Sequence, residues 1–309
     1  MKLVSRIIFV LIFTTITSQN AIAFSLKKVK SAFGGKPFLE IIEQEYTLDG
    51  QKILVIENER GNITIKTDWE CNKIALKATV HKTAENENHT NIISDTSNPQ
   101  EFVLRTLADN NKYHPHVDYE LIVPSKMKLK LINGKGDIWV NDTHGITLAS
   151  TDSGNIFLNN VQNKARAATL NAGSIHCKEC TGALYVSTTR GNIRISDAQS
   201  TVVAKTDVGK IHVKCSELKE KSQLDLSSTW GNIAIALPED CDADIKAHTE
   251  RGTCICEHYI TLRPQTTKLN DNAWSNFKRS IDGTIGSGRI PVQISSVSSN
   301  IRIAASRVS

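Results

Sequence analysis

The chain has 309 residues, of which 39% are hydrophobic and 22% charged, and its formal net charge is +5. A chain of this length can bury a sizeable core, and the composition is that of a folded protein rather than a disordered one. The small positive excess gives no reason to expect nucleic acid as a partner.

Residues 1–23 are predicted to be a signal peptide. Lys2 and Arg6 form a basic start, residues 3–14 are mostly apolar, and Ala21-Ile22-Ala23 supplies a small-residue cleavage site. The apolar run is too short to span a bilayer and no later stretch is long enough, so we expect no transmembrane segment. The mature chain is therefore expected to be exported, to the periplasm, to the outer surface or into the medium.

The next three segments differ in character. Residues 24–44 form a basic leader, and residues 45–123 are expected to be a β-rich N-terminal section whose polar run 85–100 is a mobile loop. Residues 124–305 contain regular repeats, with an irregular segment at 261–290 that carries Trp274 and Phe277. We expect this irregular segment to fold over the last repeat as a cap, because stacked repeats must cover their open ends.

The repeats follow the pattern Gly-Asn/Asp-Ile-x-Ile/Val. Their glycines stand at positions 136, 154, 173, 191, 209, 231 and 252, which are separated by 18, 19, 18, 18, 22 and 21 residues. An early copy, Gly61-Asn62-Ile63, precedes this series, and Ser299-Asn300-Ile301 is expected to close it. A nearly fixed period of this size is typical of architectures in which each unit buries its apolar face by stacking on its neighbours.

When the copies are aligned on their glycines, each offset becomes a column. The residues two and four positions after the glycine are apolar, while the residue between them is mixed. Such alternation predicts a short strand with one face inside. A second strand is expected before each glycine, with small or apolar residues five positions earlier, such as Ala168 in the third copy. The column seven positions before the glycine is also mostly apolar, but Arg166 and Thr147 spoil it. A polar column three positions before the glycine is broken by Leu170. The predicted fold is thus all-β: a β-solenoid, or β-helix, of stacked two-strand repeats of about 18–22 residues.

The sequence resembles the putative adhesin domain family of bacterial envelope proteins. The resemblance rests on the early Glu59-Arg60-Gly61-Asn62-Ile63-Thr64-Ile65 strand, the Tyr119 to Pro124 lead-in, the serial repeats, and Gly283 to Gly288 before the closing copy. It implies a β-helical extracytoplasmic protein, and related domains occur in envelope-stress systems. The family motif contains no catalytic residues, so the resemblance assigns none.

The cysteines and histidines allow two interpretations, as core residues or as a metal site. Cys177, Cys254 and Cys256 fall on inward offsets and are expected to be small core residues. The alternative is a zinc site built from residues that lie close in sequence or share an offset: His176, Cys177, Cys180, His212 and Cys215. His176 and His212 are two repeats apart with Arg194 between them, and a cation at that place argues against the site. We therefore expect no metal and no cofactor.

Trp139 and Phe157 are neighbours in one outward column and are the candidate ligand contacts. The outward columns lack the paired carboxylates of glycoside hydrolases. We expect a non-enzymatic adhesin-like interaction module that contacts an unknown protein or glycan at the cell surface, with self-association as a further option. A structural or sensory envelope component is the first alternative, and a carbohydrate-active β-helix enzyme is the second.

Overall fold

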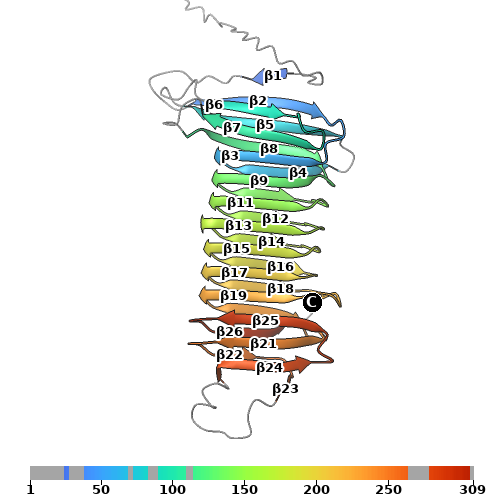
Figure 1. Ribbon diagram of the computed structural model, residues 1–309, viewed down its shortest axis with the longest axis vertical. Coiled ribbons are helices and arrows are strands. Elements are labelled where there is room, and N and C mark those ends of the chain that lie inside the picture. The colour runs from blue at the N-terminus through green and yellow to red at the C-terminus, as the bar shows by residue number, and fades with distance from the viewer. Residues whose placement is uncertain are drawn as a thin grey trace, which may run out of the picture.

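The computed structural model describes residues 24–27, 38–68, 72–82, 90–108, 114–263 and 278–306. The predicted signal peptide and the aromatic residues Trp274 and Phe277 lie outside these ranges. The described chain forms two long sheets of 13 strands each, which face each other along an elongated stack (Figure 1). The prediction of an all-β solenoid is confirmed.

The first sheet, called sheet A, contains β1 (Phe24–Lys27), β2 (Phe38–Thr47), β4 (Ile63–Asp68), β5 (Lys73–Lys82), β8 (His116–Pro124), β10 (Ile138–Asn141), β12 (Ile156–Asn159), β14 (Ile175–Lys178), β16 (Ile193–Ala198), β18 (Ile211–Cys215), β20 (Ile233–Pro238), β22 (Cys254–Cys256) and β26 (Ile301–Ser306). Sheet B contains β3 (Ile53–Arg60), β6 (Thr90–Asp95), β7 (Glu101–Ala108), β9 (Lys128–Lys135), β11 (Thr147–Ser153), β13 (Ala165–Ala172), β15 (Leu184–Arg190), β17 (Val202–Val208), β19 (Leu224–Trp230), β21 (Ala243–Thr249), β23 (Thr261–Leu262), β24 (Ser280–Ile285) and β25 (Ile290–Ser296).

Each rung of the stack is one strand of sheet B, a corner, and one strand of sheet A. Successive rungs pair in parallel. In sheet A the register forms one column of isoleucines, in the order Ile156, Ile175, Ile193, Ile211 and Ile233. These five side chains are buried. Equal offsets from the glycine therefore lie one above another, as the columns predicted, and the core is a narrow aliphatic spine between the two sheets.

The glycine of each repeat forms the corner between the two strands. From Gly61 to Gly231 the corner glycines have positive φ, between 118° and 159°. A Cβ atom on any of these residues would collide with a backbone carbonyl group of the preceding rung. Glycine is needed here because the backbones of adjacent rungs approach more closely than a side chain permits.

The Asn or Asp after the glycine joins the rungs by a side-chain ladder. Each side-chain oxygen accepts a hydrogen bond from the backbone N–H of the same position in the next rung. The donor and acceptor pairs are Asn62 to Asp118 (2.7 Å), Asp137 to Asn62 (3.0 Å), Asn155 to Asp137 (2.7 Å), Ser174 to Asn155 (2.9 Å), Asn192 to Ser174 (3.2 Å), Lys210 to Asn192 (2.9 Å), Asn300 to Asn232 (3.2 Å) and Thr253 to Asn300 (3.0 Å). The ladder explains why the motif prefers Asn and Asp at this position.

Lys210 interrupts the ladder because an ammonium group cannot accept a hydrogen bond from the N–H of Asn232 in the next rung. We expect Lys210→Asn to restore the missing bond and to raise the free energy of unfolding by about 0.5–1.5 kcal/mol. Urea unfolding followed by circular dichroism measures the change. Lys214→Asn is the matched control, since Lys214 is also exposed in this rung but lies outside the ladder. Equal effects of the two substitutions would contradict the explanation.

A second ladder lies inside the stack, where hydroxyl groups donate to the carbonyl of the preceding corner glycine. Thr151 donates to Gly136, Thr188 to Gly173 and Thr206 to Gly191, at 3.2, 2.9 and 3.2 Å. This is the predicted polar column, with one correction in the third repeat. Thr169, rather than Leu170, pairs with Thr151 and is buried, whereas Leu170 is exposed.

The register shift in β13 has a simple cause, because the step from Gly154 to Gly173 is one residue longer than its neighbours. The structure accommodates the extra residue as an irregularity between Thr169 and Ala172. All positions before it move by one, so that Ala165 and Ala167 occupy the inward columns in place of Arg166 and Ala168. The expectation that Arg166 spoils the column was wrong, since Arg166 is exposed.

The last repeat of the sequence is not the last rung of the stack. β25 lies between β19 and β21 in sheet B, and β26 lies between β20 and β22 in sheet A. In Figure 1 the red strand β25 accordingly sits above the orange strand β21. The closing copy expected at Ser299 is therefore inserted between two earlier rungs, and the rung formed by β21 and β22 ends the stack.

Both ends of the stack change from parallel to antiparallel pairing. At the N-terminal end β2 and β5 extend sheet A, and β6 extends sheet B by pairing with β7. Residues 90–95 of the expected loop 85–100 are thus a strand, and residues 38–44 of the expected leader belong to β2. At the other end β24 pairs antiparallel with β21 and with β23. The segment expected to be irregular, 261–290, therefore supplies the terminal strands of sheet B.

Candidate functional site

The predicted aromatic pair lies on the outer face of sheet A. Trp139 on β10 and Phe157 on β12 are direct neighbours in the register, and His176 on β14 continues the column. The rings are nearly parallel, with centroids 5.3 Å apart for the first pair and 5.2 Å for the second. All three side chains are half-buried. The structure therefore extends the candidate pair to an aromatic ladder of three rings.

The stacking limits what this aromatic ladder can bind. The spacing of parallel strands, about 4.8 Å, brings the ring faces against one another. Both faces of Phe157 are covered, by Trp139 and by His176. A sugar ring normally lies flat on an exposed aromatic face, and such a face is left only at the two ends of the ladder. What the ladder offers to a partner is mainly a row of ring edges, including the Trp139 indole N–H.

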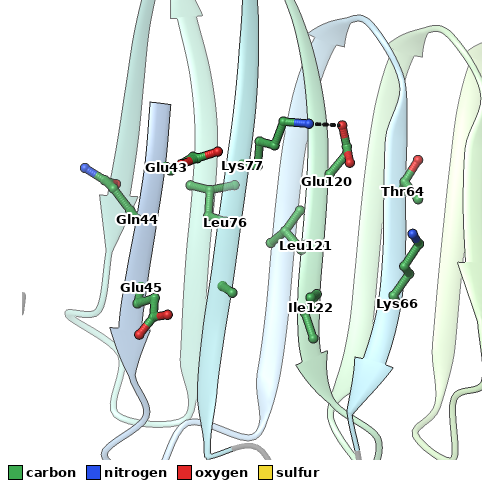
Figure 2. A pocket seen from close by; sticks show the side chains of 11 residues that line it. Glu43, Gln44, Glu45, Thr64, Lys66, Leu76, Lys77, Glu120, Leu121 and Ile122 are labelled. Carbon is green, nitrogen blue, oxygen red and sulfur yellow. Dashed lines mark hydrogen bonds and ion pairs between the residues drawn. The ribbon is translucent and has the colours of Figure 1, made fainter. Parts of the chain in front are cut away.

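A groove lies beside the aromatic ladder on the same face of sheet A. Its volume is about 440 Å³. Its lining comes from four strands: Glu43, Gln44 and Glu45 of β2, Thr64 and Lys66 of β4, Ala75, Leu76 and Lys77 of β5, and Glu120, Leu121 and Ile122 of β8. Figure 2 shows the charged side chains spread across these strands. The groove was not foreseen, because its strands come from four separate parts of the sequence.

The charges of the groove are mixed. Lys77 and Glu120 point toward each other in Figure 2 and form an ion pair of 2.9 Å. The hydrogen bond from Lys77 to Glu120 raises the pKa of Lys77. Lys66, by contrast, makes no ion pair with any residue that the structure describes. Both lysines are solvent-exposed or nearly so, and exposed ion pairs contribute little to stability.

The groove and the aromatic ladder are continuous. Thr64 lines the groove and is also the register partner of Trp139. One outward column thus runs from Glu43 through Lys77 and Glu120 to Thr64, and then along the aromatic ladder. We call this area, from β2 to β14, the aromatic-groove surface. It is the candidate binding site.

The alternative zinc site is not assembled. Cys177, Cys180 and Cys215 are buried in the core, whereas His176 and His212 lie on the outer face of sheet A. Arg194 stands between the two histidines in the register. Desolvation, and then the charge of Arg194, lowers the pKa of both histidines. The five side chains therefore do not converge on one point.

The cysteines follow the predicted inward columns, with one difference at the end of the stack. Cys177 is fully buried in the core. Cys254 and Cys256 occupy the expected offsets but are only half-buried, because β22 is the edge strand of sheet A. Burial raises the pKa of Cys215 to about 12 and that of Cys254 to about 11. Thiols with raised pKa values are poor nucleophiles, so neither Cys215 nor Cys254 is an activated thiol.

We expect the Cys215 thiol to resist iodoacetamide at pH 8 in the native protein and to react once the chain is unfolded. The thiol is buried and its pKa is raised to about 12. Cys254 and Cys256, which solvent reaches, should react first. Peptide mass spectrometry of time-quenched samples gives the order. Because the folded-state pKa is raised, Cys215 should also lower stability progressively as pH rises from about 9 towards 12. Rapid native alkylation of Cys215 would show that this part of the core is open.

Paired carboxylates do occur at the C-terminal end, where no motif indicated them. Asp244 on β21 and Asp282 on β24 both bind the guanidinium group of Arg263, at 2.8 and 2.7 Å. The two acids converge because β21 and β24 pair antiparallel. Arg263 lies between them and forms an ion pair with each, and the hydrogen bonds to Asp282 and Asp244 raise the pKa of Arg263. The arrangement fixes the terminal strands rather than leaving an acid and a base free for hydrolysis.

No helix within the described ranges has the length and apolar character needed to cross a bilayer. None of the curated proteins matches the chain. Among solved structures, the chain is similar to a putative cell adhesion protein from Clostridium sporogenes, with 12% identity, a TM-score of 0.27, and coverage of 88% of this chain and 100% of that one. It is also similar to a putative adhesin from Bacteroides fragilis, with 10% identity, a TM-score of 0.46, and coverage of 85% of this chain and 96% of that one. A putative adhesin from Parabacteroides merdae has 11% identity, a TM-score of 0.40, and coverage of 86% of this chain and 96% of that one.

These TM-scores are low, so the family assignment depends on the family model. That model, described as Toastrack DUF4097, matches residues 46–304. The match covers both sheets from the end of β2 to β26, and it confirms the resemblance to the putative adhesin domain family. The chain belongs to the Toastrack DUF4097 family.

Proposed function

We propose that the protein is an exported, non-enzymatic, adhesin-like interaction module whose partner binds across the aromatic-groove surface. The observation that carries the proposal is the continuity of the groove with the aromatic ladder on one outward face. Half-buried aromatic residues beside a groove are typical of binding surfaces, in which they supply much of the binding energy.

The geometry favours a polypeptide over a glycan as the partner. The stacked faces of the aromatic ladder leave ring edges for contact, and the groove adds carboxylates and the exposed Lys66. Six strand spacings separate β2 from β14, which is about 29 Å at about 4.8 Å each. An extended segment of about eight residues would span this length along the stack.

The test compares the wild-type protein with Trp139→Ala/Phe157→Ala in a binding assay. Beads coated with each protein are applied to epithelial cells and to bacterial envelope preparations. We expect the double variant to bind at least about tenfold more weakly, as is usual for interface aromatics. Trp230→Ala is the control, since Trp230 is exposed but lies on sheet B. An equal loss for Trp230→Ala, or no loss for the double variant, would reject the surface.

Pretreatment of the target distinguishes the two classes of partner. Protease treatment of the cells should abolish binding, whereas glycosidase treatment should leave it intact. The opposite result would identify a glycan. Fractionation of the producing cell tests export, and incubation with polysaccharides tests the enzyme alternative. New reducing ends that disappear in an Asp244→Asn or Asp282→Asn variant would favour the enzyme.

A further inference from the structure

His81, His116 and Asp118 form a compact cluster on the outer face of sheet A, beside the first corner of the stack. His81 on β5 and His116 on β8 are direct cross-strand partners in an antiparallel pair. Asp118 follows two positions after His116 and therefore faces the same side. The antiparallel strand β5 brings the two histidines together across 35 positions of sequence, which is why no motif indicated the cluster.

The distances within the cluster are short. His81 Nε2 lies 2.6 Å from Asp118 Oδ2, and His116 Nε2 lies 3.9 Å from Asp118 Oδ1. The imidazole rings are stacked with centroids 3.9 Å apart and an interplanar angle of 10°. One ligand atom from each residue can be chosen so that all three lie within 4.8 Å of one another. Ligand atoms around a tetrahedral zinc ion are about 3.4 Å apart, so small side-chain rotations would close the site.

The surroundings hold the cluster in place. The side chains of His81, His116 and Asp118 are 34%, 33% and 28% exposed, so each is largely packed yet still open to solvent on one side. The backbone N–H of Asn62 donates to Asp118 Oδ1 at 2.7 Å. Asp118 is thereby the first member of the corner ladder, which fixes the orientation of its carboxylate. Such an outer hydrogen bond is a regular feature of protein metal ligands.

We propose that His81, His116 and Asp118 bind a single Zn²⁺ ion at the N-terminal end of the stack. Two imidazoles and one carboxylate match the ligand preference of zinc, and three protein ligands leave a coordination position for water or for a group of another molecule. Mg²⁺ and Ca²⁺ prefer sites made entirely of oxygen ligands, so they should not compete. Arg60 is the nearby positive charge that acts on His116, but it is exposed and screened by water.

The bound ion would link β5 to β8. β5 belongs to the antiparallel extension, whereas β8 is part of the outermost rung. Zinc would therefore fasten the extension to the stack. This binding does not require a partner on the aromatic ladder, so it can be measured independently of the proposed function.

The experiment titrates the full purified chain with Zn²⁺ by calorimetry and follows thermal unfolding with and without the ion. We expect one equivalent to bind, and at 100 times the dissociation constant the ratio of folded to unfolded protein should rise about 100-fold. His81→Ala and His116→Ala should each weaken binding by at least about tenfold. Asp118→Asn should also weaken it, while keeping an acceptor for the Asn62 N–H.

The control variant is His176→Ala/His212→Ala, which removes two histidines from the same sheet face but from outside the cluster. It should bind zinc as the wild type does. Replacement of zinc by Co²⁺ should give an absorption spectrum without a thiolate-to-metal charge-transfer band, which excludes the cysteines as ligands. The proposal is overturned if the wild type takes up no zinc, or if His81→Ala and His116→Ala, shown by circular dichroism to be folded, bind it unchanged.

Discussion

Gly173→Ala is expected to destabilise the protein by at least about 3 kcal/mol, because steric overlap and backbone strain act together. Gly173 has a φ of 152°, and a Cβ atom there would overlap the carbonyl oxygen of Gly154. The overlapping atom belongs to the backbone of a stacked corner, so it cannot move without disturbing several rungs. Urea and thermal unfolding followed by circular dichroism measure the loss.

Gly50→Ala separates the two causes. Gly50 also has a positive φ, 91°, but the nearest atom to its Cβ position is 4.0 Å away. The free energy of unfolding of this variant should fall only by the contribution of backbone strain, about 1–2 kcal/mol. If both alanine variants lose the same stability, the close approach of rungs is not what requires glycine at the corners.

Val292→Asp is expected to lower the free energy of unfolding by at least about 4 kcal/mol, since it places a charge in the aliphatic core. Val292 on β25 is completely buried, with Leu224 on one side in the register and Ile245 on the other. Were β25 the last strand of the stack, a carboxylate at this position could reach water at the open end and would cost much less. The substitution therefore tests the insertion of the final repeat.

Ser295→Asp is the control on the same strand. Ser295 is exposed, and its register neighbours are Ser227 and His248. We expect its free energy of unfolding to change by no more than about 0.5 kcal/mol, as for most surface substitutions. A small loss of stability in both variants would indicate that β25 is loosely held at the end of the stack.

The columns of the sequence predicted the interior of the stack well. The pattern within each repeat predicts which side chains face inward, because alternation along a strand and the glycine corner are both local properties. The register from Ile138 to Ile233 accordingly follows the glycine alignment. The exception is the third repeat, where the sequence shows that one residue is extra but not where the strand absorbs it. Thr169 in place of Leu170 is the result.

The order of rungs at the C-terminal end could not be read in this way. The closing repeat with Ile301 has the same apolar pattern as its neighbours, so it fits equally well beside β20 or beyond β22. The choice depends on the connections and on the antiparallel partner β24, which are not repeated. The same reason hides the candidate site: the groove and the His81 cluster combine strands whose contacts are non-local.

The inserted final repeat has a consequence for how the molecule is completed. From β11 and β12 to β19 and β20, each new coil can pair with the coil made just before it. The rung of β21 and β22 gains its parallel neighbours only when residues 290–306 have been made. A chain that ended before residue 290 would lack β25 and β26. The edges of β19 and β20 on one side, and of β21 and β22 on the other, would then have no pairing partner. We expect proteases to cleave such a truncated chain more readily than the complete stack. The strands β25 and β26 therefore complete the stack by filling the place between the rung of β19 and β20 and the rung of β21 and β22.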